Sequence, residues 1–351
     1  MGGSITPYLY KFETSGLLRY VSRMKLHPSQ IFIDWLTIRE DHLEHHTPVH
    51  GGEKLVTDEI GALVSKISLP HRFAFEKGTS VGVKSDGYTV EISGNIAALG
   101  LLHNHHGKDL DWCKRRANMI LREYGLPEFT DKARFTRIDV TTNLTAGNPE
   151  KRDQYLRWLQ TQGHPTLKTK STAGLNTYWG RDATKASKSR TTLVYDKARH
   201  LNEVVIPELP KPDRPGVKRL AKALDKNGYI RWESRLKGYL RTSKLNWKKA
   251  THDRVASVLQ KEITAMHKAI EVADLDGIPK KYIPTLCAWL QGYDPRKLMS
   301  RTTFWRHRKA LKTYGWDIGE NGPVSIRAKQ KPIMITLQPG DPDIEKKALA
   351  K

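Results

Sequence analysis

The chain has 351 residues, which is enough for one large domain or two ordinary ones. It carries 60 lysines and arginines against 37 aspartates and glutamates, and the formal net charge of +23 favours a polyanionic partner such as nucleic acid. No apolar run is long enough to span a bilayer and no apolar export segment follows the N-terminus, so we expect no membrane contact. The two cysteines, Cys113 and Cys287, are too few for a disulfide scaffold or a cysteine zinc site, and their scarcity favours a reducing cytoplasm.

The first part of the chain predicts strands, a hairpin and one helix. Residues 31–38 are dense in β-branched and aromatic side chains, a composition typical of a buried strand. Residues 79–83 and 88–93 flank an Asp-Gly pair, which predicts a hairpin closed by a tight turn. Apolar residues then recur at three-to-four spacing over 109–124, so we expect a helix that ends at Gly125.

The middle of the chain continues with alternating strands and helices. Strand patterns occupy residues 135–143, 175–180, 190–195 and 229–237, and a helix with proline near its start covers residues 148–159. A proline-rich stretch before the last strand is a surface connection, because its prolines lack N–H donors. The interleaving predicts an α+β domain with a central, mostly antiparallel sheet and flanking helices.

The C-terminal third changes to a helical pattern. Helices are predicted over residues 281–290 and 301–314, and the turn between them contains Gly292 and Pro295. A short helix, a turn and a basic helix are typical of a helix-turn-helix DNA-binding region. The predicted organisation is an N-terminal arm over residues 1–30, a sheet domain over 31–252, a helical DNA-binding region over 253–325 and a C-terminal tail over 326–351.

The most informative segment ends the strand over 190–195, where Tyr195 precedes Lys197 by two residues. A phenol can attack phosphorus and form a covalent link. Side chains two apart on a strand share a face, so the Lys197 ammonium could lower the pKa of the Tyr195 phenol or neutralise phosphate charge. Tyr178, on the neighbouring predicted strand, is the alternative nucleophile. A tyrosine at a strand end is more often structural, and that interpretation stays open here.

Three carboxylates lie at the centres of apolar strand patterns: Glu91, Asp139 and Glu233. An unpaired carboxylate is costly there. If the three converge on one sheet face, they suit Mg²⁺ or Mn²⁺, which would polarise a scissile phosphate and offset charge on the leaving 3′-oxygen. Arginines two residues from Asp139 and Glu233 make ion pairs the alternative. His103 and His105 flank the polar Asn104, so we favour a polar loop there, although both could join the metal site.

The predicted helix over 301–314 has a basic face, while Phe304, Leu311 and Trp305 are expected to pack inward. After a turn and a preceding helix, such a face can read DNA, and a merely solvated basic face is the alternative. The arginine at the start of the strand before Tyr195 is expected to contact phosphates. The residues assigned to DNA contact are Arg190, Arg301, Arg306, His307 and Arg308.

Several blocks of the chain resemble the replication initiators of filamentous phages (inoviruses), the gene II protein family. The blocks are Val90-Glu91-Ile92 followed by His103-Asn104, Arg137-Ile138-Asp139, Arg190 to Lys197, Arg231-Trp232-Glu233-Ser234-Arg235 and Ser300-Arg301-Thr302-Thr303-Phe304-Trp305-Arg306. They occur in the family's order over residues 31–318. The resemblance implies a rolling-circle endonuclease-like fold, with a nicking and joining domain over 31–252 and Tyr195 as the nucleophile.

The resemblance further implies an enzyme that nicks the plus-strand origin of circular supercoiled phage DNA. It would form a 5′-phosphotyrosyl intermediate, leave a 3′-hydroxyl for the host polymerase and later rejoin the displaced strand. Its setting would be the cytoplasm of the bacterial host, with host helicase and polymerase as partners; no oligomeric state is predicted. A plasmid rolling-circle initiator or relaxase, and a non-catalytic sequence-specific DNA-binding repressor, are the alternatives.

Overall fold

The computed structural model describes residues 26–60, 62–74, 79–161, 163–164, 166–180, 189–271, 278–290, 293–314, 316–319, 335 and 337–349. These residues form two compact units. The larger, which we call the sheet unit, comprises the described residues from 26 to 266 together with 337–349. The smaller, the helical unit, comprises the described residues from 267 to 335. Most of the predicted N-terminal arm, residues 1–25, lies outside the described residues.

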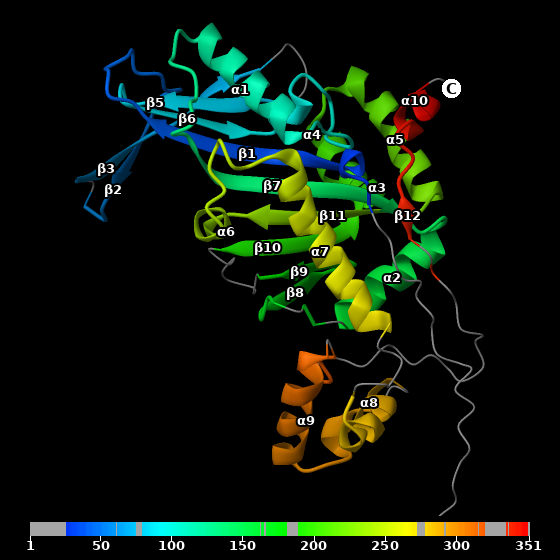
Figure 1. Cartoon of the computed structure of the whole chain (residues 1–351). Helices are drawn as coiled ribbons and strands as arrows, with labels where there is room; N and C mark the ends of the chain where they lie inside the picture. The colour runs from blue at the N-terminus through cyan, green and yellow to red at the C-terminus, as the bar shows by residue number, and fades with distance from the viewer. Residues whose placement is uncertain are drawn as a thin grey trace, which may run out of the picture. The chain divides into compact units, whose positions relative to one another are not determined.

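One large sheet forms the centre of the sheet unit (Figure 1). In the part of the chain that the structure describes, it has ten strands in the order β4-β5-β6-β1-β7-β11-β10-β9-β8, with β12 paired to the end of β7. The strands are β1 Ile31–Asp41, β4 His71–Phe73, β5 Val81–Ser85, β6 Thr89–Gly94, β7 Arg134–Thr145, β8 Lys170–Ala173, β9 Asn176–Trp179, β10 Arg190–Asp196, β11 Tyr229–Leu236 and β12 Gln338–Pro339. All the pairings are antiparallel, which confirms the predicted α+β fold.

The predicted hairpin is β5–β6, and Gly87 in its turn has a φ of 101°, a conformation that favours glycine. A second hairpin pairs β2 Glu53–Thr57 with β3 Leu63–Ser68 and was not predicted. Nearly all of its side chains are exposed. No buried face therefore imposes the alternation of apolar and polar residues by which strands are found in a sequence.

Three helices cover one face of the sheet, which we call the covered face (Figure 1). They are α1 Leu110–Glu123, α2 Pro149–Thr161 and α7 His252–Glu271. The carboxylate of Glu262 in α7 accepts hydrogen bonds from Thr192 of β10 (2.7 Å) and Ser234 of β11 (2.6 Å). Beside this contact, the buried Trp179 and Trp232 stack with ring centroids 6.3 Å apart.

The opposite face, which we call the open face, carries half-buried side chains on neighbouring strands. They are Trp35, Thr37, Lys84, Glu91, Ser93, Arg137, Tyr178 and Leu193. One end of this face is packed by α3 Lys197–His200, α5 Arg214–Lys226 and α10 Ile344–Leu349, whose apolar side chains surround Tyr229. Short helices α4 Ile206–Glu208 and α6 Gly238–Thr242 complete the connections.

The helical unit contains the two predicted helices, α8 Ile283–Leu290 and α9 Arg301–Thr313. Their core consists of Ile278, Leu286, Trp289, Phe304, Leu311, Trp316 and Ile318. The boundary of the unit lies near residue 266 and not at 252, because α7 buries Val255, Leu259 and Ile263 in the sheet unit. Within the described ranges, no helix has the length and apolar character needed to cross a membrane.

The end of the chain differs from the predicted loose tail. Residues 337–349 return to the sheet unit, where β12 pairs with β7 and the buried Ile344 of α10 joins the apolar cluster around Tyr229. Two paired residues and one short helix are too brief to give a periodic signal in the sequence. The return depends on contacts with residues about 200 positions earlier in the chain.

Candidate active site

Asp34 lies at an irregularity in the middle of β1. Its two neighbours pair with consecutive residues of β7, so Asp34 is an extra residue and the strand bulges there. The Asp34 Oδ1 accepts hydrogen bonds from the side-chain amides of Asn95 (3.2 Å) and Asn104 (2.8 Å). It also lies 3.5 Å from Nη1 of Arg231. The bulge therefore directs a carboxylate of β1 toward β11.

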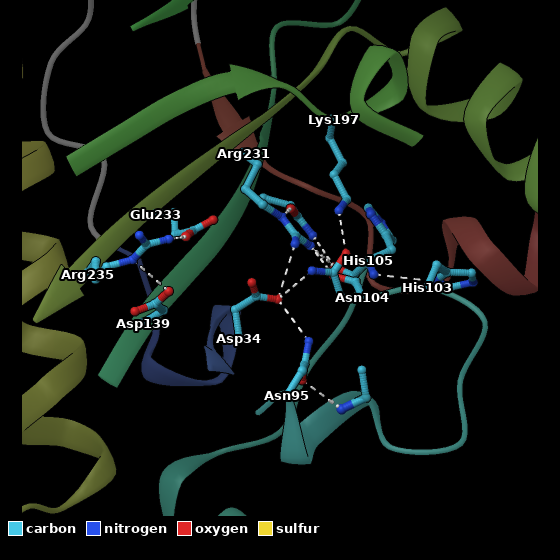
Figure 2. A network of polar contacts seen from close by, with 12 residues as sticks. Asp34, Asn95, His103, Asn104, His105, Asp139, Lys197, Arg231, Glu233 and Arg235 are labelled. Atoms are coloured by element: carbon cyan, nitrogen blue, oxygen red, sulfur yellow. Dashed lines mark hydrogen bonds and ion pairs between the residues drawn. The ribbon is translucent and has the colours of Figure 1, made fainter. Parts of the chain in front are cut away.

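Arg231 of β11 is fully buried and is the hub of the polar network in Figure 2. Its Nε donates to Asn143 Oδ1 (3.0 Å), and its Nη2 donates to the carbonyls of Asn104 (2.5 Å) and His105 (2.6 Å). With the ion pair to Asp34, the guanidinium binds acceptors from two other strands and from the loop before α1. This set of partners offsets the cost of burying the charge.

Tyr195 of β10 pairs directly with Arg231 of β11 and is only 4% exposed. Burial raises the pKa of the Tyr195 phenol, while the charge and the hydrogen bond of Arg231 act to lower it. The carboxylates of Glu233 and Asp34 act in the same direction as burial. The phenol is therefore protonated in the resting protein, beside a cation that would stabilise its phenolate.

Lys197 is the first residue of α3, and the preceding Asp196 caps this helix by accepting from a backbone N–H. Its fully buried Nζ donates to Asn104 Oδ1 (2.7 Å). Burial, and then the charge of Arg231, hold the pKa of Lys197 well below its usual range. The environment therefore shifts Lys197 toward its neutral amine, the form that can accept a proton.

Asp139 and Glu233 meet on the same sheet face. Asp139 is held by Arg137, at 2.8 and 2.5 Å, and by Arg235 at 3.2 Å. Glu233 is buried, with Oε1 3.5 Å from Arg235. Burial and the nearby charges of Asp34 and Asp139 raise the pKa of Glu233 to about 8. A proton or a cation at Glu233 would relieve this repulsion.

The carboxylate cluster supplies oxygen donors for only part of the ligand set of a divalent cation. Within the described residues, no three His, Cys, Asp or Glu side chains are placed to hold an ion by themselves. Mg²⁺ is commonly held by only one or two carboxylates, with water and substrate phosphates as its other ligands. Asp34 and Glu233 supply hard oxygen donors of this kind, and the raised pKa of Glu233 marks a position where positive charge is favoured.

Glu91 is not brought to this cluster. It pairs with Arg39 of β1, whereas Asp139 pairs with Trp35, four residues earlier on the same strand. Four residues of a strand span about 13 Å. Glu91 therefore lies on the open face, but far along it from Glu233. The sequence did not predict this separation, because an apolar pattern identifies a strand without defining its register.

Two other predicted residues lie on opposite faces. Tyr178 of β9 pairs with Leu193 on the open face. Arg190 lies on the covered face, where its Nε is 3.6 Å from the buried Glu262 and its Nη2 donates to Thr166 Oγ1 (2.6 Å). The expected contact of Arg190 with DNA beside Tyr195 is therefore not supported by its position.

The two histidines lie in a loop, as the polar Asn104 between them suggested. His103 Nε2 is 3.3 Å from Glu345 of α10. His105 is fully buried, and burial, followed by the charge of His106, holds its pKa well below its usual range. Neither histidine forms a metal-binding group with acidic residues in the described chain.

In the helical unit, α9 exposes Arg301 and Arg306 to solvent. Trp305 is 50% exposed, which corrects the expectation that it packs inward. Since residues four apart share a helix face, Arg301 and Trp305 present a basic and aromatic surface. This surface resembles those that contact nucleic acid.

The other two predicted readers on α9 are engaged within the unit. His307 Nδ1 lies 2.7 Å from Thr285 Oγ1 of α8. Arg308 binds Asp317 through two hydrogen bonds, at 2.5 and 3.1 Å, and these help to hold the pKa of Asp317 below its usual range. His307 and Arg308 therefore stabilise the fold of the helical unit.

Sequence reasoning missed three residues of the site: Asp34, Asn104 and Arg231. Asp34 carries the same signal as Asp139, a lone carboxylate in an apolar strand, and could have been found by it. Arg231 belonged to a block that resembles the family, but it was considered as an ion-pair partner of Glu233, because an arginine in a strand is usually exposed. Asn104 belonged to another such block, but no role at the site was assigned to it.

We expect Arg231→Met to lower the free energy of unfolding by about 3–5 kcal/mol, because it leaves Asp34 and two buried carbonyls without their donor. Urea unfolding followed by circular dichroism measures this change. The control is Arg199→Met, which removes an exposed ion pair with Glu203 and should cost less than about 1 kcal/mol. Equal losses in the two variants would contradict the role assigned to Arg231.

Comparison with protein-family models agrees with this geometry. The family model described as replication-associated protein G2P, N-terminal, matches residues 32–257, which include Asp34, Tyr195, Lys197, Arg231 and Glu233. The model described as replication-associated protein G2P, C-terminal, matches residues 278–337. A search of the curated proteins finds no match. The first match alone covers more than half of the chain, and the chain therefore belongs to the phage replication-associated G2P family, the gene II proteins.

Proposed function

We propose that the chain is a rolling-circle replication initiator that nicks the plus-strand origin of circular supercoiled phage DNA and later rejoins the strand. The observation that carries the proposal is the shared burial of Tyr195, Lys197 and Arg231 beside the carboxylates of Asp34 and Glu233. Together these groups offer a nucleophile, a base and a cation within one polar centre. Membership of a replication family makes a DNA phosphodiester the natural substrate.

In the nicking step, the Tyr195 oxygen attacks the scissile phosphorus and the bond to the 3′-oxygen breaks. The 5′-phosphate stays on the tyrosine, and the proton that leaves the phenol passes to the 3′-oxygen, which becomes the hydroxyl that a polymerase extends. The neutral Lys197 amine is suited to accept the phenol proton, and Arg231 is suited to stabilise the phenolate. Rejoining reverses these transfers and needs no ATP, because the phosphotyrosyl link retains the bond energy.

A single strand is the form of DNA that fits this site. Tyr195 is 4% exposed, so an extended strand can deliver a phosphate to it more readily than a rigid duplex. On the open face, the guanidinium of Arg137 lies 4.7 Å from the ring of Trp35, a pair on which unpaired bases could stack. Supercoiling would favour the reaction because it promotes local unpairing of the origin.

The proposed cofactor is Mg²⁺ or Mn²⁺, with Asp34 and Glu233 as its protein ligands and Asp139 as a neighbour. When bound, the ion would supply Lewis-acid stabilisation of the charge on the phosphate. The paired Arg137 and Arg235 hold Asp139 in place and keep it from binding the ion through both oxygens. The cation would therefore be held partly by DNA.

The helical unit is proposed to contribute origin recognition. Arg301 and Arg306 are the exposed cations of α9 among the four predicted contacts on that helix, and arginine can bind guanine through two hydrogen bonds. Nicking would take place in the cytoplasm of the bacterial host. There the host helicase would unwind the nicked DNA and the host polymerase would extend it.

Tyr195→Phe should abolish nicking of a supercoiled origin plasmid while leaving origin binding within about twofold, because only the attacking oxygen is lost. The measurement is conversion to open circles on a gel, together with mass spectrometry of the peptide left on the DNA. Tyr178→Phe is the matched control and should nick normally. A DNA-linked peptide that contains Tyr178 would move the nucleophile to β9.

Glu233→Gln and Asp34→Asn should each lower the nicking rate by at least about a hundredfold, because each removes charge that the ion requires. Titration calorimetry with Mg²⁺ in the presence of a single-stranded origin oligonucleotide should show weaker ion binding in both variants. Glu91→Gln serves as the control, since the register separates it from the cluster. If Glu91→Gln impairs ion binding and the other two variants do not, the metal site has been placed wrongly.

Arg306→Ala should weaken binding to an origin duplex by about tenfold, but binding to unrelated DNA by much less, because a base contact is specific. Fluorescence anisotropy at a fixed salt concentration provides both affinities. Lys309→Ala, on an exposed lysine of the same helix, should lower the two affinities equally. A loss for Arg306→Ala that is equal on both DNAs would make this residue a phosphate contact.

A further inference from the structure

The loop that precedes α1 supplies Asn104, which contacts three functional groups of the site. Its Oδ1 accepts from Lys197 Nζ (2.7 Å), and its Nδ2 donates to Asp34 Oδ1 (2.8 Å). Its carbonyl accepts from Arg231 Nη2 (2.5 Å). The placement of this one residue therefore fixes an amine, a carboxylate and a guanidinium relative to one another (Figure 2).

His103 holds the same loop from the other side. Its Nδ1 accepts the backbone N–H of His105 (3.3 Å), so the proton of the neutral ring is on Nε2. This Nε2 lies 3.3 Å from Glu345 Oε1, and the ring is 8% exposed. The imidazole thus joins the loop backbone to a carboxylate of α10. Asn104 lies between His103 and His105, the two loop residues that the imidazole connects.

Glu345 is held in place because the C-terminal segment is closely seated on the sheet unit. The N–H of Gly340 donates to the carbonyl of Asn143 (2.9 Å), a residue whose side chain binds Arg231. A Cβ on Gly340 would lie 2.6 Å from the ring of Tyr229. One turn further on, Ile344 is buried in the cluster around Tyr229. The carboxylate of Glu345 is therefore presented by a fixed element.

We propose that Glu345 is a positioning residue for strand cleavage, which acts through His103 on Asn104 and so holds the Lys197 amine that donates to Asn104. The C-terminal segment thereby completes the active centre, although it follows the helical unit in the sequence. This inference rests on the proposed function, because Lys197 is a base only if Tyr195 is the nucleophile. Glu345 contacts the site through His103, whose ring is only 8% exposed, so the loss of Glu345 should affect the cleavage step and not DNA binding.

The test compares Glu345→Ala with Asp343→Ala in the full-length chain. Asp343 lies two residues earlier on the same segment, where it forms an exposed ion pair with Lys346. Initial rates of nicking are measured on supercoiled origin plasmid with Mg²⁺. We expect Glu345→Ala to lower kcat about tenfold with KM unchanged, as loss of a charge-assisted hydrogen bond predicts, while Asp343→Ala keeps both constants.

Two further variants separate positioning from general stabilisation. Glu345→Gln retains an oxygen that can accept the His103 Nε2–H, so it should keep kcat within about threefold of the unmodified chain. Glu345→Ala combined with Asn104→Ala should be no slower than Asn104→Ala alone, because both changes interrupt one path. If Glu345→Ala does not fold, Glu345→Asp replaces it, since it withdraws the carboxylate by about 1.5 Å and should still lower kcat.

The inference is overturned if Glu345→Ala matches Asp343→Ala, if it raises KM with kcat unchanged, or if it accelerates nicking. Strictly additive losses in the double variant would also overturn it, because they would mean that Glu345 acts independently of Asn104. These results are distinguishable from a failure of the proposed function. In that case Tyr195→Phe would still nick DNA, whatever the behaviour of the Glu345 variants.

Discussion

The buried guanidinium of Arg231 is the interaction on which the candidate site depends. A charged side chain without exposure loses its hydration, and this cost is offset only if its donors meet acceptors. Arg231 meets Asp34 in β1, Asn143 in β7 and the carbonyls of Asn104 and His105 in the loop before α1. One side chain of β11 thus determines where two other strands and a loop place their polar groups. The bulge in β1 belongs to this arrangement, because it directs Asp34 toward the guanidinium.

The same cation also sets the protonation of the groups around it. Burial raises the pKa of Tyr195 and lowers that of Lys197, so it disfavours the charged form of each group. Arg231 lowers both values, which makes the phenol a better acid while it keeps the amine uncharged. A neutral pair costs less to bury than a phenolate with an ammonium.

Much of the fold could be predicted because strands and helices leave periodic patterns, whereas the site depends on register and long-range contacts. Tyr195 and Glu233 were found as polar residues in apolar strands, and the pairing of β10 with β11 brings them together. The separation of Glu91 from them is a matter of strand register, which a lone strand pattern does not specify. The inward direction of Arg231 depends on acceptors from other elements. The contact of Glu345 with the site loop joins residues about 240 positions apart, and a six-residue helix is too short to give a sign of it in the sequence.

The distribution of charge separates attraction of DNA from its cleavage. Three arginines of the candidate site are matched by carboxylates: Arg137 and Arg235 bind Asp139, and Arg231 binds Asp34. Paired cations release few counterions when DNA arrives, so they contribute little to nonspecific affinity. The net charge of +23 must therefore act through lysines and arginines elsewhere on the chain. Such dispersed contacts are individually weak and sensitive to salt, which suits the proposed cycle of strand cleavage and rejoining.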